Sequence, residues 1–261
     1  MKYYVDSKIL ESDKPLSLRE IFDKLEFGTD VLGAEINGEI KDFYFNPADE
    51  SKIYPIFLGN EKSLTLIRHS TAHILAQAVQ SIYPDTKVTI GPVIEDGFYY
   101  DFYTDRNFTE DDLKLFENKM HEILEKNVSF EKEVINKEKA LEIFSNMGET
   151  FKKEIINDLD ESQEISLYKQ GDWFDLCRGP HLPNSTFIKS FKLLSVAGSY
   201  WRGDETRESL QRIYGTAFSS SKDLKKHLKI LEEAKKRDHR KLGKGLDLSL
   251  IHISEPTRPL S

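Results

Sequence analysis

The stretch RHSTAH (residues 68–73) and its distant complement DLCRGPH (residues 175–181) contain the side chains around which the rest of the chain is organised. Residues four apart on a helix lie on one face, so His69 and His73 can direct two imidazoles at a single point. Cys177 and His181 have the same spacing in a loop that contains glycine and proline. The sequence therefore predicts that a helix and a far-off loop bring four nitrogen and sulfur groups to one site.

Four interpretations of this cluster remain open at the level of sequence. The histidines can be ordinary core or surface residues, as most single histidines are. All four side chains can bind a zinc ion. The site would then be closed and structural, because a catalytic zinc keeps one position for water. Cys177 can be a nucleophile beside a histidine base. Alternatively, the imidazoles and Cys177 position a water molecule at an ester carbonyl without metal or covalent intermediate.

The composition is that of a globular protein. The 261 residues are 38% hydrophobic and 31% charged, with a formal net charge of −8. That length more often forms two domains than one. The chain has no apolar run near 18 residues and no signal-peptide pattern, so we expect neither membrane insertion nor secretion. Cys177 is the only cysteine, which excludes an internal disulfide and favours a reducing, cytoplasmic location.

One segment departs from this acidic balance. Residues 222–244 contain ten lysines and arginines against four aspartates and glutamates, and they read as a long polar helix. Such a helix is either a solvated surface element or a surface for a phosphate backbone. Ser249 to Ser261 has no helical or strand period and two prolines, so we expect a disordered or foreign tail.

The periodicity predicts an α+β fold. In residues 1 to about 60, short strands alternate with one helix, which Ser17 and Glu20 open as a capping box. Asn37-Gly38 predicts a tight hairpin between strands at Val31–Ile36 and Glu39–Tyr44. Further on, the pattern predicts helices over residues 64–83, 109–124, 137–147 and 149–159, and strands near residues 88–90, 98–103, 128–134, 166–169, 173–176, 191–196 and 211–214.

Residues beside the cluster indicate the kind of substrate. Lys152 and Arg178 can meet a phosphate or a developing oxyanion, and Asp175 can hold an ammonium group. Tyr99 and Tyr100 point to opposite faces of one strand, so only one of them can line a pocket. The segment 198–203, with an aromatic pair and an arginine, can stack a base, although Trp201 can equally be a core residue.

The motifs taken together are specific. RHSTAH, TIGPVIEDGFYYDF, DLCRGPHLPNS, AGSYWRGD, LQRIYGTAF and AKKRDHRKLGK resemble, in order and spacing, the amino-terminal half of bacterial threonyl-tRNA synthetase over residues 1 to 248. The resemblance implies a ubiquitin-like β-grasp module called TGS over residues 1–60, a larger mixed α/β editing domain over 61–220 and a basic linker helix over 221–248. The tail 249–261 does not match.

The resemblance also implies site residues and a reaction. The editing pocket falls on His69, His73, Cys177 and His181, with Lys152, Asp175 and Tyr100 on its substrate side. Arg178, which adjoins Cys177, is a further candidate for substrate binding by its charge. Its reaction is hydrolysis of serine esterified to threonine tRNA, since a missing methyl group changes binding by only about 1–3 kcal/mol and cannot by itself exclude serine. Alanyl-tRNA synthetase editing domains bind zinc with the same pattern, whereas the threonine enzymes are thought to edit without metal. We expect no cofactor to be required, with zinc as the alternative.

The resemblance stops before the class II catalytic core, which holds the family's ATP site, its threonine-recognising zinc and its homodimer interface. We therefore expect a fragment that interacts with the acceptor end of threonine tRNA and cannot form threonyl adenylate. Two alternatives are a tRNA-binding or regulatory module with an idle pocket, and a free-standing deacylase of the alanyl type. In either case, binding to tRNA should weaken with salt.

Overall fold

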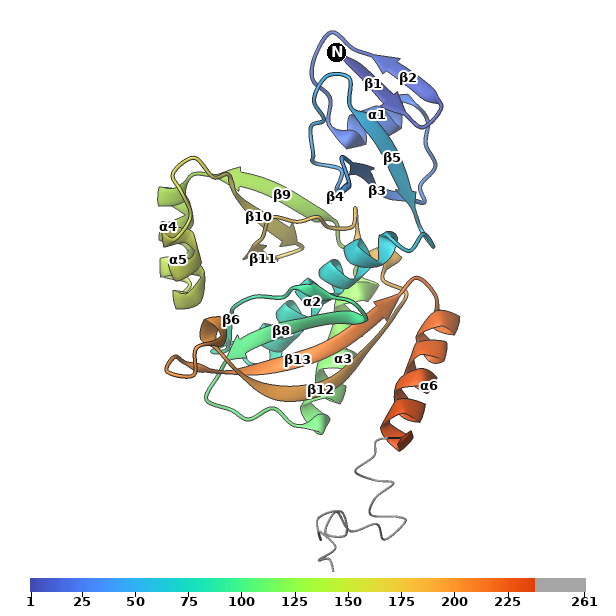
Figure 1. Ribbon diagram of the computed structural model, residues 1–261. Helices are drawn as coiled ribbons and strands as arrows, with labels where there is room; N and C mark the ends of the chain where they lie inside the picture. The colour runs from blue at the N-terminus through green and yellow to red at the C-terminus, as the bar shows by residue number, and fades with distance from the viewer. Residues whose placement is uncertain (238–261) are drawn as a thin grey trace, which may run out of the picture. The chain divides into compact units, whose positions relative to one another are not determined.

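The computed structural model describes residues 1–237. The end of the predicted linker helix and the predicted tail from Ser249 lie outside these residues. The chain divides into two units, residues 1–221 and 222–261. The first unit contains both β-sheets and helices, which confirms the α+β class (Figure 1).

The N-terminal part of the first unit is a five-stranded sheet with one helix. Its strands follow the order β2-β1-β5-β3-β4, and β1 and β5 run parallel. Residues of both the sheet and the helix share one buried core, among them Tyr3, Ile21 and Ile53. The elements are β1 (Lys2–Val5), β2 (Lys8–Glu11), α1 (Leu18–Lys24), β3 (Val31–Ile36), β4 (Glu39–Lys41) and β5 (Lys52–Phe57).

The local signals of this part are confirmed with one difference. Ser17 and Glu20 form the predicted capping box of α1, and Asn37 and Gly38 take the positive φ angles of the predicted hairpin turn. Strand β4, however, ends at Lys41 and not at Tyr44, because the carboxylate of Asp42 accepts the Tyr44 backbone N–H and turns the chain. The mixed sheet is as expected, while the TGS assignment and its boundary near residue 60 remain predictions.

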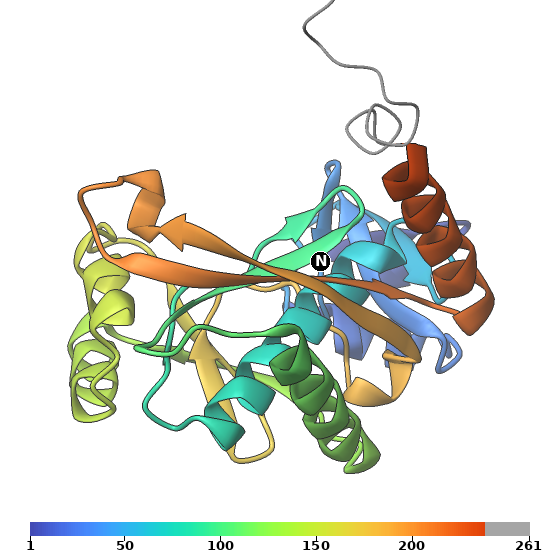
Figure 2. The ribbon, with the colours of Figure 1, turned by 90° about the horizontal axis from the view of Figure 1, so that it is seen from below.

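The central part is built around the histidine helix α2 (Ser63–Ile82). An antiparallel sheet of order β12-β13-β8-β6 carries α2 and α3 on one face, and β7 pairs with β8 (Figure 2). Thr109 and Asp112 cap α3 as predicted. The elements are β6 (Lys87–Val88), β7 (Val93–Ile94), β8 (Gly97–Tyr103), α3 (Glu110–Glu125), β12 (Ser190–Tyr200) and β13 (Ser209–Phe218), with short 3-10 helices at Ser185–Phe187 and Trp201–Gly203.

A third sheet, of order β11-β10-β9, is inserted in the sequence of the central part, between α3 and β12. It is formed by β9 (Phe130–Ile135), β10 (Ile165–Gln170) and β11 (Trp173–Leu176), with α4 (Lys137–Asn146) and α5 (Thr150–Asn157) connecting β9 to β10. The helices pack on the sheet through residues such as Phe144, Ile156 and Leu167. Strand β11 ends at Leu176, so Cys177 begins the loop that leaves the sheet, as the sequence indicated.

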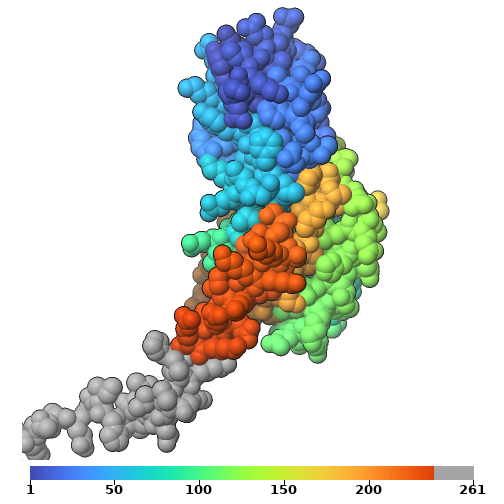
Figure 3. All heavy atoms as spheres, turned by 90° about the vertical axis from the view of Figure 1, so that its right-hand side faces the viewer, coloured from blue at the N-terminus to red at the C-terminus, as the bar shows by residue number. Residues whose placement is uncertain are grey.

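The start of α2 adjoins the N-terminal sheet. Leu32 and Ile56 belong to the same buried cluster as Leu66, and the space-filling view shows this sheet in blue next to the cyan start of α2 (Figure 3). The second unit begins at Lys222, in the first turn of α6 (Ser221–Arg237), and this helix confirms the predicted basic helix as far as Arg237. No helix within residues 1–237 is long and apolar enough to span a membrane.

Candidate functional site

The helix and the loop meet as the spacing of their residues predicts. The Nε2 atom of His69 lies 3.0 Å from the Sγ atom of Cys177, and the Nε2 atom of His181 lies 3.4 Å from the same sulfur. The ring of His73 is centred 4.3 Å from that of His181 and 5.1 Å from that of His69. One donor atom from each of the four residues lies within 4.8 Å of all the others. The cluster is therefore a single group of three imidazoles and one thiol.

His181 is held by contacts on several sides. Its Nδ1 atom lies 3.1 Å from the hydroxyl of Ser70, which also accepts the backbone N–H of Leu182 at 2.9 Å. The ring of Phe130 stacks on the His181 imidazole at 5.2 Å, and the ring of Tyr168 lies 4.5 Å away. Sequence reasoning missed the role of Ser70, although its place three residues before His73 on α2 was a usable signal.

His73 has a different environment. Its side chain is buried, and its Nδ1 atom has no hydrogen-bond partner among the described residues. Gln170 donates a hydrogen bond to the backbone carbonyl of His73, and Trp173 contacts its ring edge to face at 5.8 Å. A buried ring nitrogen without a partner is costly. This atom is therefore a candidate to receive a bound water, substrate group or metal.

Burial keeps the ionisable groups of the cluster neutral. Desolvation lowers the pKa of His69 to about 4 and lowers the pKa of His73 and of His181 well below the usual value. Desolvation also raises the pKa of the Cys177 thiol to about 12, although the Gly179 N–H that donates to its sulfur acts in the opposite direction. At neutral pH the cluster holds uncharged imidazoles, which can accept protons, and an uncharged thiol.

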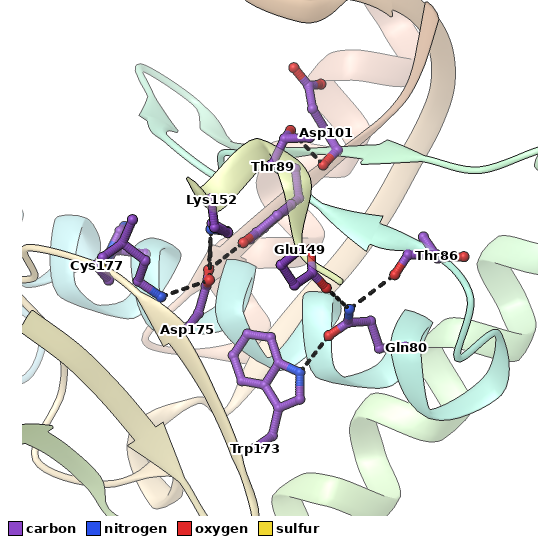
Figure 4. Close-up of polar contacts among 12 residues, drawn as sticks. Gln80, Thr86, Thr89, Asp101, Glu149, Lys152, Trp173, Asp175 and Cys177 are labelled. Carbon is purple, nitrogen blue, oxygen red and sulfur yellow. Dashed lines mark hydrogen bonds and ion pairs between the residues drawn. The ribbon is translucent and has the colours of Figure 1, made fainter. Parts of the chain in front are cut away.

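A buried acid–base pair stands beside the cluster. The Nζ atom of Lys152 lies 2.6 Å from one carboxylate oxygen of Asp175 and 2.8 Å from the other (Figure 4). The Tyr100 hydroxyl donates to Asp175 at 2.6 Å, and the Leu176 backbone N–H donates at 2.8 Å. Burial and the neighbouring Asp175 raise the pKa of Tyr100. Both oxygens of Asp175 thus already have donors from the protein itself.

A second buried network adjoins this pair and was not predicted. Gln80 of α2 donates to the Glu149 carboxylate at 2.8 Å and accepts the indole N–H of Trp173 at 2.8 Å (Figure 4). Burial raises the pKa of Glu149. Glu149 precedes α5, whose third residue is Lys152. The network therefore ties α2, the start of α5 and β11 together behind the site.

The cluster opens into a cavity of about 420 Å³. This volume falls in the range of about 300–1,000 Å³ that is typical of small-molecule sites. All the predicted site residues line the cavity except His181, which lies behind Cys177 and is only 1% exposed. The lining also contains residues that the sequence did not single out, chiefly Thr89, Ile90, Gly91, Pro92, Ile155, Leu159, Glu164, Ile165 and Ser166.

Three other expectations can be compared with the structure. Tyr100 lines the cavity while Tyr99 lies on the other face of β8 with Arg212 over its ring, so the expected division of the two tyrosines is confirmed. Arg178 is exposed and lines the cavity. Trp201 is buried against Phe151 and donates to Glu154, so it is a core residue and the base-stacking alternative at this position is wrong.

The four donor atoms also fit a metal ion. Tetrahedral zinc with bonds of about 2.0–2.3 Å places its ligands roughly 3.3–3.8 Å apart. The Cys177 sulfur lies 3.0 Å from His69 and 3.4 Å from His181, and all four donor atoms lie within 4.8 Å of one another. The contact between Ser70 and the second nitrogen of His181 resembles the outer partner that orients a histidine ligand. With all four residues bound, however, such a metal has no open position for water.

One segment of the chain is similar to a described protein family. Residues 165–214 match the family described as "Threonyl and Alanyl tRNA synthetase second additional domain". That segment contains Asp175, Cys177 and His181, whereas His69 and His73 come from outside it. The site therefore combines a loop of this domain with a helix that precedes it in the sequence.

The chain is also similar to the amino-terminal region of several longer proteins. The chain is 47% identical over 245 residues to threonine–tRNA ligase of Legionella pneumophila strain Corby, which covers 93% of the chain and 38% of that relative. It is 51% identical over 222 residues to the enzyme of Rickettsia bellii strain OSU 85-389, or 85% of the chain and 35% of that relative. It is 45% identical over 256 residues to threonine–tRNA ligase of Clostridium tetani, which covers 97% of the chain and 40% of that relative. The resemblance to the amino-terminal region of threonyl-tRNA synthetases is thus confirmed, and the chain spans about two fifths of the length of these relatives.

Proposed function

We propose that the chain is a proofreading module that hydrolyses serine from mischarged threonine tRNA. The observation that carries the proposal is the convergence of His69, His73, Cys177 and His181 beside a cavity of small-molecule size. Neutral imidazoles at neutral pH can take a proton from water as it attacks an ester carbonyl. Reaction of one water with the ester bond releases free serine and restores the terminal ribose hydroxyl of the tRNA.

The protonation states favour the route without a covalent intermediate. A cysteine nucleophile acts as a thiolate, and its pKa is usually lowered by a nearby positive charge or a helix N-terminus. Burial has the opposite effect on Cys177, whose pKa is raised to about 12. We therefore assign to Cys177 and His69 the positioning of the attacking water, and to the buried His73 and His181 the support of that pair.

The Lys152–Asp175 pair forms the polar side of the proposed substrate site. Asp175 accepts the substrate ammonium, for which Lys152 gives up one of its two short contacts. The freed Nζ atom can then stabilise negative charge on the carbonyl oxygen or on the terminal phosphate. Tyr100 keeps its hydrogen bond to Asp175 and orients it, while Arg178 at the exposed side meets the nucleic-acid backbone.

No cofactor is required in this proposal. If zinc binds the cluster, these four residues hold it, and the ion supplies a structural link between α2 and the loop after β11. Hydrolysis in our proposal uses the side chains in their metal-free form, because four protein ligands leave a tetrahedral zinc no position for water.

Deacylation of Ser-tRNA(Thr) by the purified chain tests the proposal. We expect hydrolysis by the wild type and its loss in His73→Ala and Cys177→Ala variants, with retention in His121→Ala, an exposed histidine outside the cluster. Binding of the tRNA without turnover would support the idle binding module instead. Because the matching family description names both threonyl and alanyl enzymes, Ser-tRNA(Ala) is the second substrate, and a preference for it would support the alanyl-type deacylase.

A further inference from the structure

Asp42 is a buried carboxylate of the N-terminal sheet that contacts the site. It follows strand β4 and is only 6% exposed. Its Oδ2 atom accepts the Tyr168 hydroxyl at 2.6 Å and the backbone N–H of His181 at 3.2 Å, while its Oδ1 atom accepts the Tyr44 N–H at 3.1 Å. No lysine or arginine within residues 1–237 forms an ion pair with it. The carboxylate is therefore satisfied by neutral donors, two of which belong to the site.

The loop between Cys177 and His181 lies directly against this carboxylate. Gly179 has a φ of +77°, and a Cβ atom at that position would come within 2.8 Å of Asp42 Oδ2 and 2.5 Å of the Tyr168 hydroxyl. The N–H of the same glycine donates to the Cys177 sulfur at 3.2 Å. Asp42 and Tyr168 thus border one side of the loop at Gly179. The backbone N–H of this same glycine contacts the Cys177 sulfur.

A second connection starts from the same turn, at Tyr44. The hydroxyl of Tyr44 donates to the carbonyl of Phe130 at 3.0 Å, and the Phe130 ring stacks on His181 with an interplanar angle of 9°. Two residues of one turn therefore contact His181 or its neighbour. Asp42 accepts the His181 backbone N–H, and Tyr44 contacts Phe130, the stacking partner of His181. Figure 1 shows β4, which precedes this turn, and β9, which begins with Phe130.

We propose that Asp42 is a positioning residue for the His69–His73–Cys177–His181 cluster, so that the N-terminal sheet completes the scaffold of the site. Asp42 fixes the Cys177–His181 loop at the distance from α2 at which Cys177 meets His69. The effect on hydrolysis rests on the proposed function, whereas the effect on loop position does not. Misplacement of a reacting group by about 1 Å can lower a rate by roughly a hundredfold.

The reactivity of the single cysteine tests loop position directly. Because Cys177 is the only cysteine of the chain, the rate of its reaction with a thiol reagent such as dithionitrobenzoate reports on this loop alone. We expect Asp42→Ala to raise that rate by roughly tenfold to a hundredfold, and Tyr168→Phe by about tenfold, because hydrogen bonds to a charged group restrain local opening. Asp49→Ala is the matched control, since its carboxylate accepts the Lys2 N–H in the same sheet, and it should leave the rate unchanged.

Denaturant dependence separates a positioning role from a general loss of stability. Local opening of the loop exposes little surface, so the thiol reaction of Asp42→Ala should respond weakly to low concentrations of urea, whereas reaction through global unfolding responds steeply. Deacylation should show a lower kcat with little change in KM. If Asp42→Ala does not fold, Tyr168→Phe, which removes one hydroxyl, decides the question.

The two proposals fail in different ways. Absence of Ser-tRNA hydrolysis by the wild type would reject the proposed function, and the thiol rates would still decide the role of Asp42. Unchanged Cys177 reactivity in both Asp42→Ala and Tyr168→Phe would overturn the positioning role, even if every variant hydrolysed Ser-tRNA. A steep urea dependence of the faster reaction would overturn it as well.

Discussion

The Nε2 atom of His69 lies 3.0 Å from the Sγ atom of Cys177, and these two groups are the partly exposed members of the cluster. His73 and His181 are buried behind them. Reagents and substrates entering the cavity therefore meet the His69–Cys177 pair first. Because burial holds the imidazole and the thiol neutral, their contact is a hydrogen bond between uncharged groups and not a thiolate–imidazolium pair.

Cys177→Ser distinguishes water positioning from nucleophilic attack. A serine hydroxyl keeps a donor and an acceptor near His69, so we expect the serine variant to lose about tenfold in deacylation. Cys177→Ala removes the group that positions the water, and we expect a loss of roughly 10²–10⁴-fold, as large as the loss of an acid–base group. The measurement is single-turnover hydrolysis of Ser-tRNA. A thioester trapped on the wild-type chain, with equal losses in the two variants, would favour the nucleophile.

Lys152→Met should destabilise the fold strongly. The change leaves the buried Asp175 without its cation, which typically costs about 3–5 kcal/mol of unfolding free energy. Adding Asp175→Asn should recover part of that loss, because the charge is then gone. Lys192→Met breaks an exposed pair with Glu117 and serves as the control, with an expected loss below about 1 kcal/mol. Urea denaturation measures all of these, and equal losses for Lys152→Met and Lys192→Met would contradict the account.

Gly91→Ala should disturb Tyr100. A Cβ atom at Gly91 would come 2.3 Å from the Tyr100 ring, which is 1% exposed and cannot move freely. We expect the ring to shift away from Asp175 and KM for Ser-tRNA to rise several-fold, with a loss of about 1–3 kcal/mol in stability from overpacking. Gly198→Ala is the control, since nothing lies within 4 Å of its added Cβ. A Gly91→Ala variant indistinguishable from Gly198→Ala would show that Tyr100 does not orient the acid–base pair.

The stability of the chain should fall as the pH is lowered from about 7 to about 4. An unfolded histidine titrates near pH 6.5, whereas burial lowers the pKa of His69 to about 4 in the fold. Between these values the unfolded chain binds protons that the folded chain does not, so the unfolding free energy decreases with falling pH. His69→Gln should show a shallower slope in urea denaturation with chelator present, and a slope identical to that of the wild type would contradict the burial effect.

Added zinc should inhibit deacylation. The four donor atoms could hold a tetrahedral ion, and binding would occupy the thiol and the His69 imidazole that we assign to water positioning. We expect full activity in the presence of a chelator and a progressive loss on titration with zinc, with cobalt absorption spectra reporting on ligation by the Cys177 thiolate. Loss of activity on chelation, restored by zinc, would instead identify a metal-dependent hydrolase.

Part of the fold and part of the site were predictable from local sequence patterns. The four-residue spacing of His69 and His73 follows from helical geometry, and the capping box at Ser17 and the turn at Asn37-Gly38 depend on neighbours within a few residues. The order of motifs along the chain identified its relatives, since that likeness is a property of the sequence itself. The end of β4 at Lys41 escaped prediction because the Asp42 side chain competes with the strand for its backbone.

By itself, the sequence predicted which groups meet at the cavity: three imidazoles, one thiol and the polar residues Lys152, Asp175 and Tyr100. The predictions came from residue spacing, from motifs or, for Lys152, from the resemblance to a family. Only the tertiary structure decided which partners they have and how they are charged. The Lys152–Asp175 pair, the contact of Ser70 with His181 and the reach of Asp42 to the loop join residues far apart in the sequence. Protonation depends on burial, which is a property of the packed chain and not of any short stretch of it.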